Sequence, residues 1–318
     1  MLTLDRCAGH TLDPDAWDRF VGASPQGSLY ALHGYATAVR PDWEAWIVAD
    51  QGAWQAVMPF CTNRRWGFRS LPQPMFTQYW GVLFRPMPEL ALREQLYLKK
   101  EILQLLIRQM DDFQLIVQNF SPYFDYGAPF HWGGFQLFQR YTYLLSLKPG
   151  TEALYAQLQS DLPRKIRRAQ QHMTVLPGSV GELTALMEAN QQAGRDITGG
   201  PVSFDAMRRM LEYLTRSGNG GIRCTSGREA ALAYGHFGKQ TLYLMGAFDP
   251  EQSRSNGMSL LMWELIRLAA ARGDEQLDFE GSMIEGVEGF FRKFGASPVP
   301  YLQIRRNRLP QLIRWMHA

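Results

Sequence analysis

The segment from Gln240 to Gly281 constrains the fold most, because it predicts a strand, a polar loop, a helix and a second strand in that order. In TLYLMGAF two sets of side chains alternate, as they do in a buried strand. From Gly257 onward apolar residues recur at helical spacing, and Gly273 is a typical helix end. A loop that opens a helix directly after a strand offers backbone N–H groups and the positive end of the helix dipole to an anion.

The loop between this strand and helix has the form R-x-x-G-x-S. Gly257 permits close approach of the backbone, Asn256 is a suitable helix cap, and Arg254 adds a forked cation. The candidate phosphate-binding residues are therefore Arg254, Asn256, Gly257, Met258 and Ser259. The same pattern also fits an ordinary turn between a strand and a helix, so the loop alone does not decide the matter.

The R-x-x-G-x-S loop resembles the R/Q-x-x-G-x-G/A loop by which GNAT acyltransferases hold acyl-CoA, with Ser259 where that family usually has Gly or Ala. The tail LDFEGSMIEGVEGFFRKFGAS resembles the "D-x-x-G... F-K-x-x-F-G" close of the Fem peptidoglycan-bridge transferases (FemAB-like) and of their BioF-like GNAT relatives. The resemblance extends upstream to SPQGSLYALHGYA, PMFTQYWGVLF and DLPRKIRRAQQHMTV, and so covers most of the chain.

The resemblance implies an α/β (α+β) chain of two tandem GNAT-like domains, with mixed, mostly antiparallel sheets flanked by helices. The alternation of strands and helices agrees with such layers. We expect the domain boundary at Lys148-Pro149-Gly150. Residues 1–147 would form a degenerate GNAT-like domain and residues 148–318 the domain with the donor site. No sequence repeat is visible, so the duplication rests on the resemblance.

Local patterns predict several further elements. Two aromatic-rich runs around Gln51-Gly52 predict a hairpin, and residues 88–110 predict a long amphipathic helix. A helix is expected from Thr151 to about His172, in which Pro163 marks either a kink or a new first turn. Three consecutive antiparallel strands are expected before the loop at Arg254.

Composition and charge limit the classes of protein to which this chain can belong. Of the 318 residues 46% are hydrophobic, which is ample for cores, and the net charge of +3 is too small to indicate DNA binding. The three cysteines Cys7, Cys61 and Cys224 are far apart and odd in number, which predicts a reduced, cytoplasmic protein without a zinc site. The sequence shows no signal peptide, no apolar run long enough to span a membrane and no metal-binding motif, so we expect no metal.

Two carboxylates are candidate catalytic groups. If EQLDFEGS is a strand, Asp278 and Glu280 face the same way beside the proposed donor loop, and either can deprotonate an amine. We favour Glu280, which lies nearer the strand end; the alternative is that both carboxylates pair with arginines or cap a helix. Tyr243, on the strand before the loop, is a candidate donor of a proton to a leaving thiolate.

Candidate substrate-binding residues come from three segments. Arg164, Arg167 and Arg168 share one helix face, and the resemblance implies that an arginine here lies near a phosphate-bearing acceptor; the alternative is a solvated face. The resemblance places Lys293 near the donor, although it also fits a solvated helix rim. The segment with Gln78, Tyr79 and Trp80 resembles one that lines the family's acceptor groove between the domains, and aromatics beside Gly81 also suit core packing.

These residues predict an N-acyltransferase that moves an acyl group, most simply acetyl, from acetyl-CoA or another acyl-CoA to an amine held between the domains, by direct attack. The acceptor would be a small molecule or a cell-envelope precursor. The alternatives are a Fem-type aminoacyltransferase, which uses aminoacyl-tRNA and a peptidoglycan-precursor-like acceptor, and a non-catalytic protein that binds a saccharide or nucleotide sugar. The tRNA-dependent enzymes often carry a coiled-coil arm, and residues 151–200 show no heptads, which favours CoA.

Overall fold

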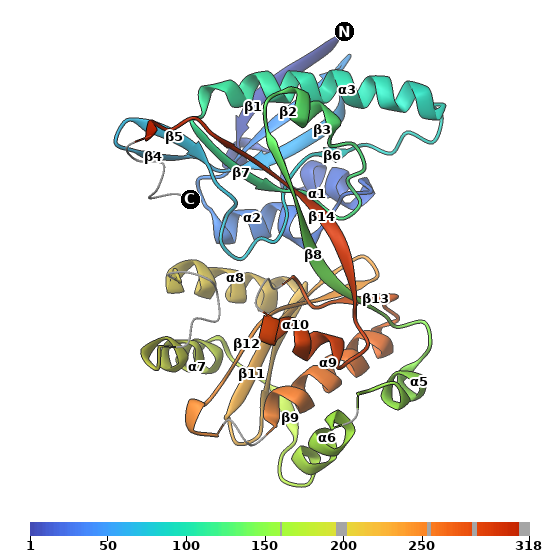
Figure 1. Ribbon diagram of the computed structural model, residues 1–318, viewed down its shortest axis with the longest axis vertical. Coiled ribbons are helices and arrows are strands. Elements are labelled where there is room, and N and C mark those ends of the chain that lie inside the picture. The colour runs from blue at the N-terminus through green and yellow to red at the C-terminus, as the bar shows by residue number, and fades with distance from the viewer. Residues whose placement is uncertain (160, 195–201, 253–255, 282–284, 312–318) are drawn as a thin grey trace. The chain divides into compact units, whose positions relative to one another are not determined.

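The computed structural model describes residues 1–159, 161–194, 202–252, 256–281 and 285–311 (Figure 1). The chain divides into two compact units, one formed by Met1–Arg140 with Pro300–Ala318 and the other by Tyr141–Val299. The sequence suggested a division after residue 147 and a last strand in the second unit. The divisions observed instead fall inside two strands, β8 (Gln136–Ser146) and β14 (Ser297–Asn307).

In its described residues the first unit has one sheet of its own, part of a second sheet and four α-helices. One sheet has the antiparallel order β1-β2-β3-β6, and the strands β4, β5, β7 and β14 follow one another in the second. Its strands are β1 (Leu2–Ala8), β2 (Glu44–Asp50), β3 (Ala53–Phe60), β4 (Asn63–Arg65), β5 (Phe68–Leu71), β6 (Leu83–Phe84) and β7 (Leu115–Asn119). Its helices are α1 (Pro14–Ala23), α2 (His33–Val39), α3 (Leu92–Gln109) and α4 (Ala128–Trp132), with 3-10 turns η1 (Gly9–Thr11), η2 (Leu29–Ala31) and η3 (Met110–Asp112).

Sequence patterns in the first unit predict its main elements. The expected hairpin is formed by β2 and β3, whose turn residues Gln51 and Gly52 have φ of 49° and 82°, the left-handed values that a tight hairpin turn requires. The expected long helix is α3, whose Ile102, Leu103 and Leu106 are fully buried in the core of this unit. The strand β1, which pairs with β2, was not foreseen.

The second unit is built around one sheet. Antiparallel strands β9 to β12 are followed by β13, which runs parallel to β12 and antiparallel to β8. Its strands are β9 (Val175–Pro177), β10 (Gly220–Thr225), β11 (Ala230–Phe237), β12 (Gln240–Phe248) and β13 (Gln276–Asp278). Its helices are α5 (Thr151–Ala156), α6 (Leu162–Gln170), α7 (Val180–Gln192), α8 (Phe204–Ser217), α9 (Gly257–Arg272) and α10 (Glu285–Arg292), with the 3-10 turn η4 (Pro250–Gln252).

Helices cover both faces of this sheet. Figure 1 shows α7 and α8 on one side of β11 and β12, and α9 with α6 on the other. The helix α9 ends as the sequence predicts, because Gly273 adopts a φ of 86° at its C-cap. The expected helix from residue 151 is two helices, and Pro163 lies in the first turn of the second, α6, where a missing N–H costs nothing. Within the part of the chain that is described, no helix is both long and apolar enough to cross a membrane.

A partly buried histidine, His236, lies where β11 and β12 meet. The Nδ1 atom of His236 is 2.9 Å from Oγ1 of Thr241, whose hydroxyl donates to Asp274 at 2.5 Å. Burial lowers the pKa of His236 to about 4, and the charge of Arg272 acts in the same direction, while Asp274 opposes both. The imidazole is therefore neutral in the folded protein at neutral pH.

This histidine makes stability depend on pH. The unfolded imidazole binds its proton near pH 6.5 and the folded one only near pH 4, so stability falls as the pH drops through this window. We expect His236 to account for about 2 to 3 kcal/mol of the loss between pH 7 and pH 4. Urea unfolding of the wild type and of His236→Asn at several pH values measures this, and parallel pH dependences for the two proteins would contradict it.

Candidate active site

The strands β12 and β13 part at the predicted site. Their parallel pairing joins Gln240 to Gln276 and ends with Leu242 opposite Asp278. At the next residue the backbone N–H of Phe279 donates to the carbonyl of Tyr143 on β8 at 2.9 Å, so the chain continues along β8 and leaves β12. The part of β12 from Tyr243 to Phe248 thus extends beyond its paired neighbour, and a wedge opens between the two strands.

A bulge lies on β12 at this point. Ala233 pairs with Met245 and Tyr234 pairs with Tyr243, so Leu244 is an extra residue in the antiparallel ladder with β11. A bulge bends its strand and redirects side chains. The simple alternation expected for TLYLMGAF is therefore interrupted, although the strand itself is confirmed.

Glu280 and Tyr243 lie together at this wedge. Glu280 follows the end of β13 by two residues and has a left-handed φ of 56°. Burial, and to a lesser degree the negative charge of Glu280, raise the pKa of Tyr243 well above its ordinary value. The phenol therefore keeps its proton at neutral pH. Two of the three residues that the sequence proposed as catalytic are close enough to interact electrostatically.

Asp278 has a different position from the one expected. Because β13 ends at Asp278, the two carboxylates do not share one strand face. Asp278 is 1% exposed, and it accepts hydrogen bonds from the hydroxyl of Thr142 at 2.5 Å and from the backbone N–H of Glu280 at 2.9 Å. Its carboxylate holds the turn that carries Glu280.

The start of α9 lies against the bulge. A Cβ atom on Gly246 would lie 2.6 Å from the terminal methyl of Met258 and 2.7 Å from the hydroxyl of Tyr243, so the absence of a side chain at Gly246 leaves room for both groups. Sequence analysis missed Gly246, because a glycine inside a strand is informative only when its neighbours in space are known.

The first turn of α9 fits the predicted loop only in part. Asn256 occupies the cap position with a φ of 63°, but its side chain makes no capping hydrogen bond. Its carbonyl accepts the N–H groups of Ser259 at 3.1 Å and Leu260 at 3.2 Å. Gly257 and Ser259 are buried. Arg254 lies outside the described residues.

This arrangement can be compared with known proteins. Residues 156–292 match a family model described as an acetyltransferase (GNAT) domain. The second unit is a GNAT domain. The wedge between β12 and β13, the bulge and the following helix all lie within the matched residues.

Solved structures resemble the whole chain in fold. FemX aligns with a TM-score of 0.66 and 13% identity over 99% of this chain and 100% of its own. L-PGS from Bacillus licheniformis aligns with a TM-score of 0.55 and 12% identity over 96% of this chain and 95% of its own. A tandem GNAT protein from the clavulanic acid biosynthesis pathway aligns with a TM-score of 0.57 and 10% identity over 98% of this chain and 100% of its own. No curated protein sequence matches the chain. The GNAT match supports an acyltransferase, and the chain as a whole has the two-domain fold that the sequence predicted, similar to the folds of FemX and of the tandem GNAT protein.

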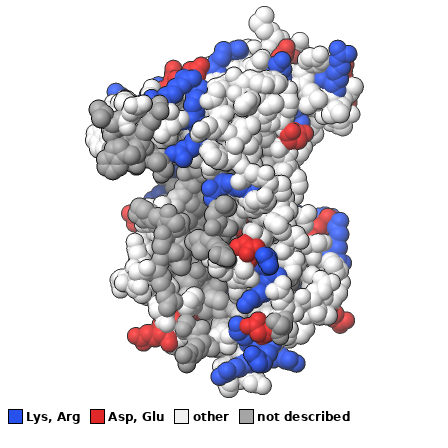
Figure 2. All heavy atoms as spheres, viewed as in Figure 1, with Lys and Arg blue, Asp and Glu red and all other residues white. Residues whose placement is uncertain are grey.

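The arginines of α6 lie on an exposed face of the GNAT domain. Leu162, Ile166 and Ala169 on the same helix pack into the core. Arg164, Arg167 and Arg168 are exposed, and none of them forms an ion pair within the described residues. Figure 2 shows basic side chains gathered over the end of this unit where Figure 1 places α6.

Lys293 lies beside the start of the same helix. Its Nζ is 3.8 Å from a carboxylate oxygen of Asp161, and Lys165 holds the other oxygen at 2.6 Å. These contacts join the end of α10 to the start of α6. Whether Lys293 also contacts a donor stays a prediction.

The segment Gln78-Tyr79-Trp80 belongs to the first unit. Tyr79 and Trp80 are buried, and the indole N–H of Trp80 donates to the carbonyl of Tyr30 at 2.8 Å, so both rings pack in the core. The amide oxygen and nitrogen of Gln78 are buried and have no hydrogen-bond partner within the described residues. Of the three, Gln78 has the capacity left to bind a ligand.

The role given to Asp278 predicts a stability effect. Replacing Asp278 by alanine leaves the Thr142 hydroxyl and the Glu280 N–H without their acceptor, which should cost about 3 kcal/mol. Asp278→Asn keeps one acceptor oxygen and should cost clearly less. Urea unfolding measures both; equal stability of the alanine variant and the wild type would show that the carboxylate does not hold this turn.

Proposed function

We propose that this acyltransferase moves an acyl group, most simply acetyl, from acyl-CoA to a primary amine by direct attack. The observation that carries the proposal is the parting of β12 and β13, with Glu280 and Tyr243 at the wedge and the start of α9 beside it. A wedge in a sheet exposes backbone groups that a linear acyl donor can approach, and the helix start offers a site for its phosphates.

The donor would lie along the open edge of β12. Backbone N–H groups of the bulge around Leu244 would polarise the thioester carbonyl. The diphosphate would lie at the loop that contains Arg254, Gly257, Met258 and Ser259. Because the N–H of Ser259 already donates to the Asn256 carbonyl, we expect Arg254 and the helix dipole to contribute more to diphosphate binding than this N–H does.

Glu280 would act as the base. It would take a proton from the acceptor amine, directly or through a water molecule, as the C–N bond forms and the C–S bond of the thioester breaks. Tyr243, whose raised pKa keeps it protonated, would donate a hydrogen bond or its proton to the departing thiolate. Asp278 would position the turn. Most of the rate gain would come from orientation and from stabilisation of the oxyanion.

The acceptor would be an amine that also carries anionic groups. Exposed Arg164, Arg167 and Arg168 and the neighbouring Lys293 favour a molecule with phosphate or carboxylate groups, such as a small metabolite or a cell-envelope precursor. The unpaired amide of Gln78 favours a ligand with both a hydrogen-bond donor and an acceptor.

A second donor has specific support. The fold likeness to FemX extends over 99% of this chain and is thus not confined to the GNAT domain. An aminoacyl ester of tRNA would place its carbonyl at the same bulge and use the same base. The R-x-x-G-x-S loop and the absence of heptads in residues 151–200 favour CoA.

Calorimetric titration with CoA, acetyl-CoA and charged tRNA distinguishes the donors. We expect CoA to bind, and both Gly257→Val and Arg254→Ala to weaken it about tenfold or more, because the first fills the loop and the second removes a cation. Binding of charged tRNA but not of CoA supports the Fem-type alternative. Equal CoA affinity in both variants would rule out the phosphate-loop assignment.

The base is tested by kinetics. In Glu280→Gln we expect the kcat for acetyl transfer to a panel of amines to fall about 100-fold, with little change in the KM for acetyl-CoA. Glu275→Gln is the matched control, because Glu275 directly precedes β13, at its other end, and pairs with Lys239 at 2.9 Å. An equal fall in both variants, or none in Glu280→Gln, would exclude Glu280 as the base.

A further inference from the structure

The helix α3 of the first unit has an apolar surface on its exposed side. Its second half contributes Ile102, Leu103 and Leu106 to the core. In its first half, however, Leu92 is 72% exposed and Tyr97 is 57% exposed. A surface helix normally turns polar residues to solvent, so this face has the composition of a binding surface.

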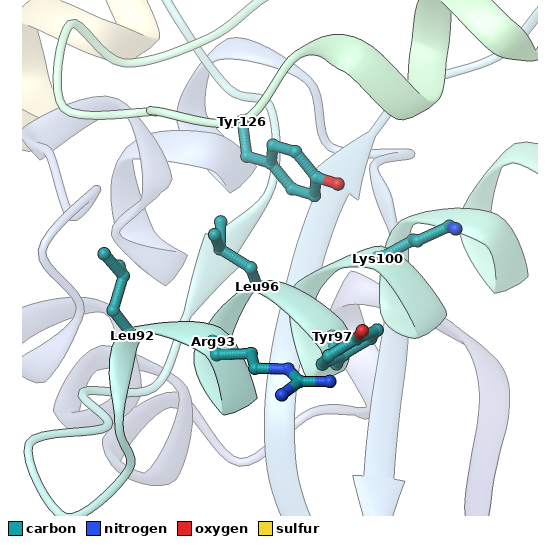
Figure 3. A pocket seen from close by; sticks show the side chains of 6 residues that line it. All are labelled: Leu92, Arg93, Leu96, Tyr97, Lys100 and Tyr126. Atoms are coloured by element: carbon teal, nitrogen blue, oxygen red, sulfur yellow. The ribbon is translucent and has the colours of Figure 1, made fainter.

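A groove runs along this face. It has a volume of about 390 Å³. The residues that line it are Leu92, Arg93, Leu96, Tyr97 and Lys100 of α3 and Tyr126 from the loop before α4 (Figure 3). Figure 3 shows the ring of Tyr126 across the groove from Leu96, the side chain of Arg93 reaching toward Tyr97, and Lys100 farther along the helix. The volume lies within the range of small-ligand pockets, roughly 300 to 1,000 Å³.

Both cations of the groove are held by aromatic rings. The guanidinium of Arg93 lies 5.5 Å from the ring centre of Tyr97, and Nζ of Lys100 lies 5.4 Å from that of Trp132. Contact with a ring face leaves the positive charge available for an anion, unlike pairing with a carboxylate.

The charges of the groove are uncompensated, in contrast to those around it. Nearby Lys99 is paired with Asp125 at 2.8 Å. Within the described residues neither Arg93 nor Lys100 forms an ion pair, and no carboxylate lines the groove. An apolar floor with two unpaired cations and no anion complements a molecule that is both apolar and negatively charged.

We propose that this groove binds a small amphipathic anion, with an aryl or short alkyl body and a carboxylate, sulfonate or phosphate group. The body lies on Leu92, Leu96 and Tyr126, and the anionic group reaches Arg93 or Lys100. These two cations are seven residues apart, about 10 Å along the helix, so a compact anion engages one of them at a time. The concave shape favours a single molecule over a flat bilayer.

The proposal does not depend on the acyl-transfer mechanism. The groove lies wholly within the first unit, outside residues 156–292 that match the GNAT domain. Loss of catalysis in a variant of Glu280 therefore says nothing about the groove, and the two ideas fail separately.

Two matched fluorescent probes test the proposal. 8-Anilinonaphthalene-1-sulfonate has an apolar body and an anionic group, and N-phenyl-1-naphthylamine has the same rings without the sulfonate. We expect the wild type to bind the sulfonate more tightly. The double variant Arg93→Gln/Lys100→Gln should bind the sulfonate about tenfold more weakly and the neutral probe with unchanged affinity. Leu96→Asn should lower the affinity for both probes.

Arg65→Gln is the control variant, because Arg65 lies 4.3 Å from the ring of Trp66, which is 58% exposed and does not line the groove. It should bind both probes as the wild type does. Thermal unfolding establishes that each variant is folded, and the double charge variant decides the question if Leu96→Asn does not fold. Unchanged sulfonate affinity in the double variant overturns the proposal. So does binding only to vesicles that contain anionic phospholipid, which would make this face a membrane surface.

Discussion

The separation of β13 from β12, while the chain stays paired with β8, is the constraint on which the proposed active site depends. A sheet gains most from continuous pairing, yet the pairing of β12 with β13 stops at Leu242 and Asp278. The N–H of Phe279 instead bonds to Tyr143, and Thr142 beside it fixes the carboxylate of Asp278. The strand β12 therefore extends beyond its pairing with β13, and the buried carboxylate of Asp278 holds the diverging turn by accepting hydrogen bonds from Thr142 and from the backbone N–H of Glu280.

The residues around the wedge support one another through packing. The ring centre of Phe291 on α10 lies 6.0 Å from that of Tyr243 and 5.1 Å from that of Phe279, so aromatic rings pack against the proposed proton donor. Gly246 gives the hydroxyl of Tyr243 and the methyl of Met258 room to meet. A site on strands and helices fixed in this way is more precise than one carried by loops alone.

Local sequence patterns predicted the helices and strands well, but they did not predict which residues these elements contact. Helix α9 and the antiparallel strands before it were foreseen, because apolar spacing and Gly273 are visible within a few residues. The bulge at Leu244 was not, since it depends on the register with β11. The burial of Asp278 was missed for a similar reason: its partner Thr142 is 136 residues away in the chain. The proximity of Glu280 to Tyr243 agrees with the sequence analysis, but the left-handed turn at Glu280 was not foreseen.

The return of β14 to the first unit has a consequence for synthesis on the ribosome. Residues 303–307 of β14 pair with β7, yet they are made only after all of Tyr141–Val299. Until they emerge, one edge of β7 lacks this partner strand, although Met1–Arg140 of that unit have already been made. The GNAT domain, in contrast, comes from one uninterrupted stretch of chain. The nascent first unit must therefore wait for its final strand with an exposed edge, a state prone to wrong pairing.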